Sequence, residues 1–244
     1  MGSLGVSNPL EGACPLLICS KLNRMGGLSV QFRDRAEAGA LLGRRLQQET
    51  WDDPIVLALP RGGVPVAECV ADAIGGELGV VVTRKIGAPH NRELAIGAVD
   101  PDGRTIIDSR IVQALAVDDS YIRAETSRQL QEIERRMAEY CENGDVPNLE
   151  ARDVVLVDDG IATGYTILAA ARYVRRHGPA RTVIATPVCP PDVFSKLQEE
   201  ADMVVNLLLP AHFIAVGQFY EDFSQVSDAD VRNILTRVYT KGSR

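Results

Sequence analysis

The sequence predicts an α/β fold: a Rossmann-like parallel sheet flanked by helices. Five short apolar runs support this prediction, and most have the β-branched content of strands that are buried on both faces. These runs are residues 55–59, 79–83, 154–157, 182–186 and 203–209. The first and the third are each followed by a glycine-containing loop and then by apolar residues at helical spacing. This strand–loop–helix order is typical of a parallel sheet.

The strongest functional signal lies at the end of the predicted strand 154–157. Asp158 and Asp159 follow the strand directly, and a small-residue loop over residues 160–164 leads into the next helix. The loop amides, the helix N-terminus and two threonine hydroxyls together favour an anion. The two carboxylates instead suit sugar hydroxyls or a metal. One ligand that suits both the anion-binding loop and the two carboxylates is a ribose 5-phosphate.

A simpler interpretation is available for this stretch, because an acidic pair at a strand end is often a solvated turn with a helix cap. The full pattern of four apolar residues, two aspartates, a glycine and a Thr-Gly pair is much more specific than an acidic pair alone, and it favours a binding site. A P-loop is excluded, since no lysine follows Gly164.

Two further groups of residues suit a second anion. The loop after residues 55–59 contains Arg61, Gly62 and Gly63, and adjacent glycines allow exposed amides. Arg84 and Lys85 stand at the end of the predicted strand 79–83, where two cations repel each other unless an anion lies near. A plain turn and a surface charge pair are the simpler alternatives.

Residues 154–166 resemble the phosphoribosyl-pyrophosphate (PRPP) signature of type I phosphoribosyltransferases, and the likeness extends over about residues 30–240. The whole is most similar to a bacterial branch described only as predicted phosphoribosyltransferases, whose acceptor is not established. The resemblance implies that Asp158 and Asp159 hold the ribose hydroxyls. It implies a 5-phosphate loop made of Gly160, Ile161, Ala162, Thr163, Gly164 and Thr166.

The same resemblance assigns the other anion groups. It implies that Arg61, Gly62 and Gly63 bind pyrophosphate, often through a strained or cis peptide, and that Arg84 and Lys85 act on the pyrophosphate as catalytic residues. Mg²⁺ is the expected cofactor, held mainly by PRPP itself.

Residues 86–104 are interrupted by glycines and prolines, and Asp102-Gly103 is typical of a hairpin turn between arms 95–99 and 105–107. In the family a flexible hairpin here closes over PRPP. Its candidate substrate contacts are His90, Asn91, Arg92 and Glu93.

The acceptor side is predicted less specifically. A small hood over about residues 210–226 is rich in aromatic residues, and Phe213, Phe219 and Tyr220 either stack on a flat base or form a subdomain core. Hypoxanthine-guanine members carry an aspartate where this chain has Ala162. This difference argues against that activity and leaves adenine-like, orotate-like and non-base acceptors open. Glu93 and Asp222 are the candidate bases.

The other helices are expected to serve packing. A capping-box-like start at Asp34 and Glu37 opens the first, and Ser227 and Asp230 cap the last. A long helix over residues 119–141 presents one apolar stripe and one charged face. Residues 1–24 are expected to be a loosely ordered leader to a domain over residues 25–244.

Composition narrows the class of protein. A net charge of −7 argues against a broad nucleic-acid surface, and no apolar run reaches the roughly 18 residues of a membrane span. The five cysteines share no metal or redox spacing, which favours free thiols and a cytoplasmic location. A homodimer is one expected assembly, because dimers are common in the family.

The resulting functional prediction is a phosphoribosyltransferase of nucleotide metabolism that moves ribose 5-phosphate from PRPP to a nitrogenous acceptor. Its partners are PRPP and that acceptor, with no nucleic acid and no membrane. A PRPP-binding regulatory protein without transferase activity is the alternative. A phosphohydrolase or receiver-like domain that uses Asp158 and Asp159 is a third class, which the glycine-rich loop argues against.

Overall fold

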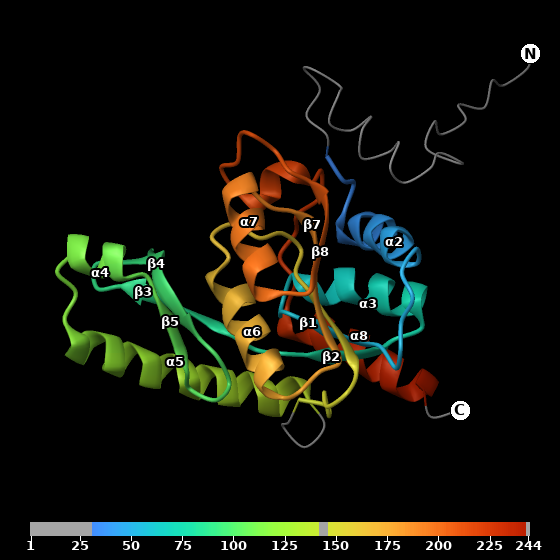
Figure 1. Ribbon diagram of the computed structural model, residues 1–244, viewed down its shortest axis with the longest axis horizontal. Coiled ribbons are helices and arrows are strands. Elements are labelled where there is room, and N and C mark those ends of the chain that lie inside the picture. The colour runs from blue at the N-terminus through green and yellow to red at the C-terminus, as the bar shows by residue number, and fades with distance from the viewer. Residues whose placement is uncertain (1–30, 142–145, 243–244) are drawn as a thin grey trace, which may run out of the picture.

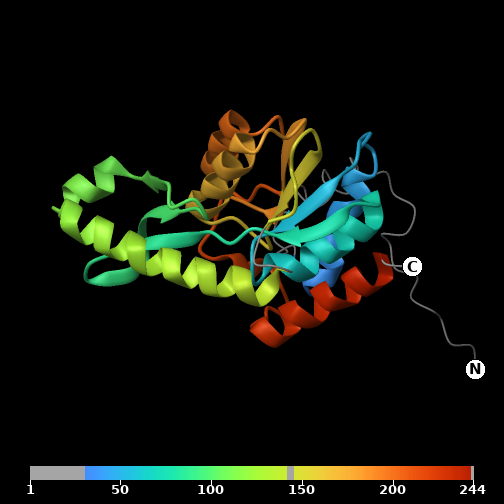
Figure 2. The same ribbon diagram turned by 90° about the horizontal axis from the view of Figure 1, so that it is seen from below.

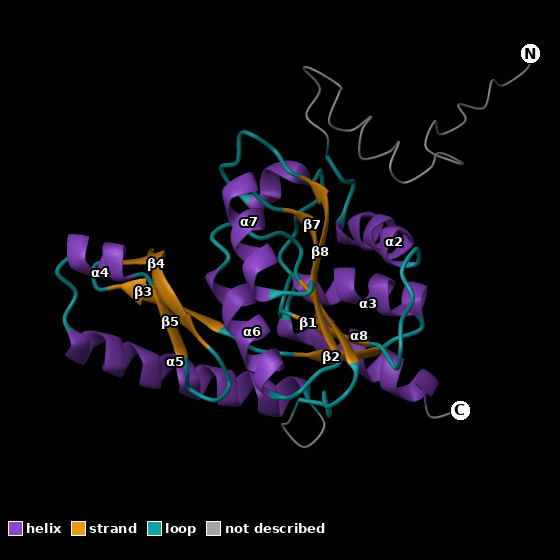
Figure 3. Ribbon diagram, in the orientation of Figure 1, coloured by secondary structure: helices purple, strands orange, loops and turns teal. Residues whose placement is uncertain are grey.

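The computed structural model describes residues 31–141 and 146–242. In this part of the chain, a body built on one parallel sheet carries a lobe that projects to one side, as Figure 1 shows. The body sheet has the strand order β2-β1-β6-β7-β8, and every neighbouring pair is parallel. Its strands, orange in Figure 3, are β1 (Ile55–Ala58), β2 (Glu77–Val80), β6 (Asp153–Val157), β7 (Arg181–Val188) and β8 (Met203–Leu208).

Alternate residues of the strands pack against helices on opposite faces of this sheet. Val56 and Val155 belong to one apolar cluster, and Ile55 and Leu156 belong to another. Successive side chains of a strand point to opposite faces, so burial on both sides explains the continuous apolar runs in the sequence. One face is covered by α2 (Arg35–Leu46), α3 (Gly63–Ile74) and α8 (Asp228–Gly242), and the other by α6 (Tyr165–Arg176) and α7 (Pro191–Glu200).

Two helix starts use the predicted capping residues. At α2, Asp34 Oδ1 accepts from the Glu37 amide at 2.8 Å, while Glu37 Oε2 accepts from the Arg33 amide at 2.6 Å. At α8, Asp230 Oδ2 accepts from the Ser227 amide at 2.9 Å. These short-range bonds satisfy amides that have no partner inside the helix, which is why the local sequence was sufficient to predict them.

The lobe is a three-stranded antiparallel sheet with a long helix packed along it, as Figure 2 shows from below. The predicted hairpin is confirmed, since residues 97–99 pair with residues 105–107. The lobe consists of β3 (Arg84–Ala88), β4 (Asn91–Val99), β5 (Thr105–Ile107), α4 (Ser109–Ala114) and α5 (Asp119–Tyr140).

The predicted strand over residues 79–83 is wrong in its extent. The body strand β2 ends at Val80, and Arg84 and Lys85 begin a strand of the lobe sheet instead of ending a strand of the body sheet. The chain passes between the two sheets through residues 81–83, of which Val81 and Val82 are fully buried. Because burial continues across the connection, the apolar pattern alone does not reveal where pairing changes from one sheet to the other.

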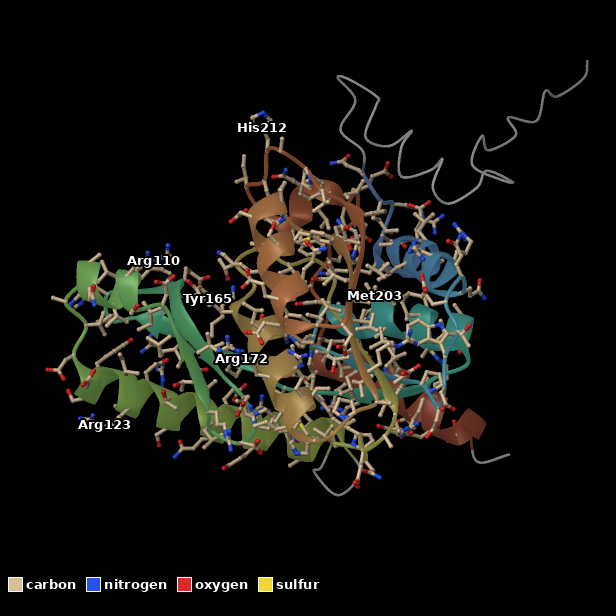
Figure 4. The ribbon with its side chains drawn as sticks, in the orientation of Figure 1. Arg110, Arg123, Tyr165, Arg172, Met203 and His212 are labelled. Atoms are coloured by element: carbon tan, nitrogen blue, oxygen red, sulfur yellow. The ribbon has the colours of Figure 1, made fainter. Side chains whose placement is uncertain are left out.

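Side chains at both ends of α6 attach the lobe to the body. At the start of the helix, Tyr165 Oη donates to Asp108 Oδ2 at 2.7 Å, and Figure 4 labels Tyr165 between α6 and the lobe. At the end of the helix, Arg176 Nη2 lies 2.5 Å from Asp100 Oδ2 and 2.9 Å from Asp102 Oδ2. The hairpin that the sequence predicts as a lid is therefore joined to the body along the length of α6.

Replacing Arg176 with methionine is expected to lower the free energy of unfolding by about 2–4 kcal/mol, because the Asp100 carboxylate would remain buried without its cationic partner. Among the described residues, only the Asp102 and Arg104 amides would still donate to it. The Asp100 side chain is only 3% exposed, whereas that of Asp102 is 41% exposed. Asp102→Asn is the matched control, and we expect it to cost less than about 1 kcal/mol. Urea denaturation measures both variants, and equal losses would contradict this account of the ion pairs.

The first described residues pair with the segment predicted as a hood. Phe32 forms a parallel β-bridge with Tyr220, and its amide donates to the Phe219 carbonyl at 2.7 Å. This segment includes the short 3₁₀ helix η2 (Val216–Phe219). The predicted leader over residues 1–24 lies outside the described residues. Among the helices of the described part, none has both the length and the apolar character that crossing a membrane requires.

Candidate functional site

The loop between β6 and α6 contains the residues that the sequence predicts to bind an anion. The strand ends at Val157, and α6 begins at Tyr165 after Gly164, whose φ of 83° is accessible chiefly to glycine. Ala162 and Thr163 are exposed at the loop surface, while Ile161 is buried and its amide donates to the Val188 carbonyl at 2.9 Å. The buried residue anchors the loop, while Ala162 and Thr163 are presented at the surface just before the N-terminus of α6.

Gly160 allows this loop to approach the predicted hood closely. A Cβ atom at this position would lie 2.9 Å from Val216 Cγ2 and 3.1 Å from Val188 Cγ1. Both distances are shorter than an ordinary contact between carbon atoms. The predicted phosphate loop and the predicted hood segment are therefore packed directly against each other at Gly160.

The loop after β1 lies directly against the acidic pair. The peptide bond between Pro60 and Arg61 is cis, which agrees with the expectation for this loop. A Cβ atom on Gly62 would lie 2.6 Å from Asp159 Cγ, and one on Gly63 would lie 2.7 Å from the Val157 carbonyl oxygen. Only glycines fit this contact, so the structure brings the predicted pyrophosphate loop to the predicted ribose carboxylates.

The two aspartates have different surroundings. The Asp159 amide donates to Asp158 Oδ1 at 2.9 Å, and Asp159 Oδ2 accepts from Arg35 Nε at 2.7 Å. Burial and then the adjacent Asp159 carboxylate raise the pKa of Asp158 well above its usual value, and Lys85 opposes this effect. Burial also raises the pKa of Asp159, although the Arg35 guanidinium acts in the opposite direction.

The raised pKa of Asp158 has a consequence for stability. An acid whose pKa is higher in the folded state than in the unfolded state loses stability as the pH rises between these two values. Asp158→Asn removes this loss, so we expect the variant to be more stable than the parent protein at pH 8. The difference should shrink as the pH falls towards 5. Thermal unfolding across this range measures it, with the exposed Asp72→Asn as control, and a difference independent of pH would contradict the assignment.

A cavity of about 860 Å³ lies between the ends of the body strands and the lobe. Thr83 Oγ1 donates to the Thr166 carbonyl at 3.1 Å. This hydrogen bond joins the connection between the two sheets, residues 81–83, to the start of α6. Of the predicted site residues, the cavity brings Thr166 together with Arg84, Lys85, Arg92 and Glu93. The two aspartates, the loop over residues 160–164 and the predicted pyrophosphate residues 61–63 are not among its lining residues. Its lining includes Pro60, Arg84, Lys85, Arg92, Glu93 and Thr166.

Arg84 is a half-buried cation in this cavity. Its Nε donates to Gln129 Oε1 at 3.0 Å, and Gln129 Nε2 donates to Glu125 Oε1 at 2.7 Å. Burial and then the nearby Arg136 guanidinium lower the pKa of Arg84. An arginine whose charge is disfavoured by its surroundings would be stabilised by a bound anion.

Two of the predicted lid residues lie elsewhere. His90 and Asn91 line a separate cavity of about 380 Å³ at the tip of the lobe, together with apolar residues such as Leu94 and Leu115. Only Arg92 and Glu93, of the four lid residues proposed as substrate contacts, therefore line the large cavity. His90 and Asn91 lie at the turn between β3 and β4, away from the large cavity.

The aromatic residues of the hood mainly form a small core. Phe219 is 8% exposed and Tyr220 is 4% exposed, and both pack in a cluster with Phe32. Phe213 is half-buried, with its ring centroid 5.5 Å from that of Phe219. Their burial favours packing for Phe219 and Tyr220, while stacking of Phe213 on an acceptor stays a prediction.

Several polar residues of the site were not identified from the sequence. Arg35 belongs to a helix that was assigned to packing alone, and Gln129 and Glu125 belong to the charged helix α5. Both α5 residues are nearly buried, at 9% and 8% exposure. No local signal distinguishes them from the other polar residues of their helices, because the contacts that bring them to the site, Arg35 with Asp159 and Gln129 with Arg84, join distant parts of the chain.

Of the two candidate bases, only Glu93 lines the large cavity. Asp222 is exposed and accepts from the Ser224 amide at 2.9 Å, and the Ser224 hydroxyl and amide lower the pKa of its carboxyl. A carboxylate with a lowered pKa is a weaker base. Asp222 is therefore better placed to shape the loop than to accept a proton.

Comparison with known proteins identifies the family. The model of the phosphoribosyl transferase domain matches residues 35–223. Two curated Mycobacterium tuberculosis proteins, from strains CDC 1551 and H37Rv and each named "Putative phosphoribosyl transferase", are 42% identical over 208 residues. That match covers 85% of this chain and 47% of each relative, so the chain spans about half the length of these curated relatives.

A solved structure gives the same result. The protein TT1426 from Thermus thermophilus is 43% identical and superimposes with a TM-score of 0.70. The match covers 85% of this chain and 98% of that one. The length of the domain match and the identity to the relatives, together with the two adjoining loops described above, lead to one conclusion: this chain belongs to the phosphoribosyl transferase domain family.

Proposed function

We propose that this protein transfers ribose 5-phosphate from PRPP to a nitrogenous acceptor and releases pyrophosphate. The observation that carries the proposal is the direct contact between the loops that follow β1 and β6, with the aspartates at their junction. A ligand that fits this arrangement has two anionic ends and a polar centre between them, which describes PRPP.

Each group of residues has a role in the proposed ligand complex. Within the predicted 5-phosphate loop, Ala162, Thr163, Gly164 and Thr166 hold the 5-phosphate. Gly160 and Ile161 anchor the loop, because the Ile161 amide already donates to the Val188 carbonyl and Gly160 packs against Val216. Asp158 and Asp159 serve the ribose hydroxyls, directly or by shaping their site, and Arg61, Gly62 and Gly63 receive the pyrophosphate. Backbone amides suit the phosphates because they donate hydrogen bonds without the cost of ordering a side chain.

The reaction is a displacement at ribose C1. The bond from C1 to the pyrophosphate oxygen breaks, a bond from the acceptor nitrogen to C1 forms, and the acceptor proton passes to a base or to water. Negative charge grows on the departing pyrophosphate, so Arg84 and Lys85 are proposed to stabilise it by electrostatics and position. Glu93 is the candidate base, because it lines the same cavity.

Magnesium is the cofactor that the site suits. Magnesium bound with phosphates needs one or two protein carboxylates. Asp158 offers a half-buried carboxylate, whereas the Asp159 carboxylate is already paired with Arg35. Asp158 would hold the ion together with the phosphate oxygens, and the ion would neutralise charge on the polyphosphate.

The acceptor is proposed only as a class. Ala162 carries no proton-accepting group in the phosphate loop, so purine acceptors that rely on such a group are disfavoured. Adenine-like bases, orotate-like bases and amines that are not bases remain candidates.

The decisive experiment has two stages. Isothermal titration calorimetry with PRPP and Mg²⁺ tests binding, and a screen of bases and amines for pyrophosphate release tests transfer. We expect binding, followed by release with one class of acceptor. If PRPP gives no heat of binding, the proposal is wrong. If PRPP binds but no acceptor ever reacts, a PRPP-sensing regulator is the better description.

A further inference from the structure

A buried ion pair joins two segments that are far apart in the sequence. Arg35 Nε lies 2.7 Å from Asp159 Oδ2, and each side chain is 12% exposed. Removing two charges from water is costly, and the attraction between them offsets this cost only when the remaining hydrogen-bonding groups are also satisfied. The other contacts of both residues are therefore informative.

The Arg35 guanidinium is held from three sides. Asp159 accepts from Nε, and the Ser224 carbonyl accepts from Nη1 at 2.8 Å. The ring of Phe223 lies below the guanidinium, with its centroid 3.9 Å from Cζ. An arginine fork with two fixed acceptors and an aromatic face has little freedom to move. Arg35 therefore connects α2, the acidic pair and the hood segment.

The Asp159 carboxylate supports the pyrophosphate loop. A Cβ atom on Gly62 would lie 2.6 Å from Asp159 Cγ, so the loop backbone rests on this carboxylate. The backbone of the same residue is also held, because Tyr220 Oη donates to the Asp159 backbone carbonyl at 2.6 Å. Arg35, Arg61, Gly62 and Asp159 line one cavity of about 380 Å³ beside the loop.

We infer that Arg35 is a positioning residue for the loop over residues 60–63, the part of the proposed site that receives pyrophosphate. It holds the Asp159 carboxylate under Gly62, and this carboxylate holds the loop over residues 60–63 in the shape that receives pyrophosphate. Asp158 is then the carboxylate left to meet the ribose hydroxyls. The inference rests on the proposed function, because the loop is assigned to pyrophosphate there.

The test compares a ligand for the loop after β1, which is pyrophosphate, with a ligand for the loop after β6, which is ribose 5-phosphate. Arg35→Lys keeps the charge but removes the second hydrogen bond and the stacking on Phe223. We expect this variant to bind inorganic pyrophosphate with Mg²⁺ roughly tenfold more weakly, because misplacement of a binding loop by a fraction of an ångström lowers affinity. Binding of ribose 5-phosphate, which depends on the loop after β6, should change less than about twofold.

A second variant guards against a simple loss of folding. The double variant Arg35→Met with Asp159→Asn removes both charges together and leaves no unpaired ion buried. We expect it to unfold cooperatively and to bind pyrophosphate more weakly than the parent protein. Because Asp159 also belongs to the proposed ribose site, the comparison with ribose 5-phosphate is made on Arg35→Lys alone. Arg45→Lys is the matched control, because Arg45 belongs to the same helix and forms a half-buried pair with Glu49 of the same segment.

The outcomes separate the inference from the proposed function. Unchanged pyrophosphate affinity in Arg35→Lys, or equal weakening of both ligands, overturns the positioning role. Absence of pyrophosphate binding by the parent protein also overturns it. If the parent protein binds pyrophosphate but not PRPP, the proposed function alone fails, and the role of Arg35 is still decided by the pyrophosphate comparison.

Discussion

Replacing Gly63 with alanine is expected to weaken PRPP binding by about 100-fold or more, because the two substrate loops can no longer meet. The added Cβ atom would lie 2.7 Å from the Val157 carbonyl oxygen and 3.0 Å from Asp158 Cα. Both are backbone atoms at the end of a buried strand, so no side-chain rotation relieves the clash. The loop after β1 must move away from the aspartates. Isothermal titration calorimetry with PRPP and Mg²⁺ measures the loss.

Gly178→Ala is the control for this variant. Gly178 has a φ of 64°, and its added Cβ atom would lie 4.0 Å from its nearest neighbour, Glu150 Cγ. The substitution therefore costs about 1 kcal/mol through its backbone conformation but creates no contact near the site. We expect PRPP affinity to be retained. If Gly63→Ala bound PRPP as tightly as this control, the contact between the loops would not matter for binding.

Removing both cations at the start of β3 is expected to lower kcat/KM for pyrophosphate release by about 100- to 1000-fold. The double variant is Arg84→Met with Lys85→Met. Burial and neighbouring guanidinium groups lower the pKa of Arg84, so its charge is not favoured by the fold itself. We therefore expect the free energy of unfolding to change by no more than about 1 kcal/mol. Steady-state kinetics and urea denaturation measure the two effects.

The matched control removes the same amount of charge outside the cavity. Arg123 is exposed on α5, far from the body of the molecule in Figure 4, and Lys196 is exposed on α7. The variant Arg123→Met with Lys196→Met is expected to keep its activity. An equal loss in both double variants would indicate that overall charge, and not contact with pyrophosphate, controls the rate.

Features that depend on neighbouring residues were predictable. The strands β1 and β6, the loops that follow them, the hairpin turn at Gly103 and the cap at Asp34 each depend on residues that are adjacent in the chain. The cis peptide after Pro60 was expected from the resemblance to a family, because the residue types alone do not require it.

Features that depend on contacts between distant segments were not predictable. The helix over residues 119–141 was correctly predicted as a helix with a charged face, yet two of its polar residues are buried beside Arg84. Periodicity identifies which face of a helix is apolar, but it does not identify which polar side chain meets a cation from another sheet. For the same reason, the aromatic content of the hood did not reveal that Phe219 and Tyr220 are buried.

The sequence by itself determined the parallel α/β sheet and the two glycine-rich loops at its carboxyl edge, since hydrophobic period and turn chemistry are local properties. The tertiary structure alone decided that Arg35 pairs with Asp159 across 124 positions of sequence, and that α6 holds the lobe at both ends. The physical reason is that ion pairs and buried hydrogen bonds form wherever packing brings their groups together, and packing is a property of the whole chain.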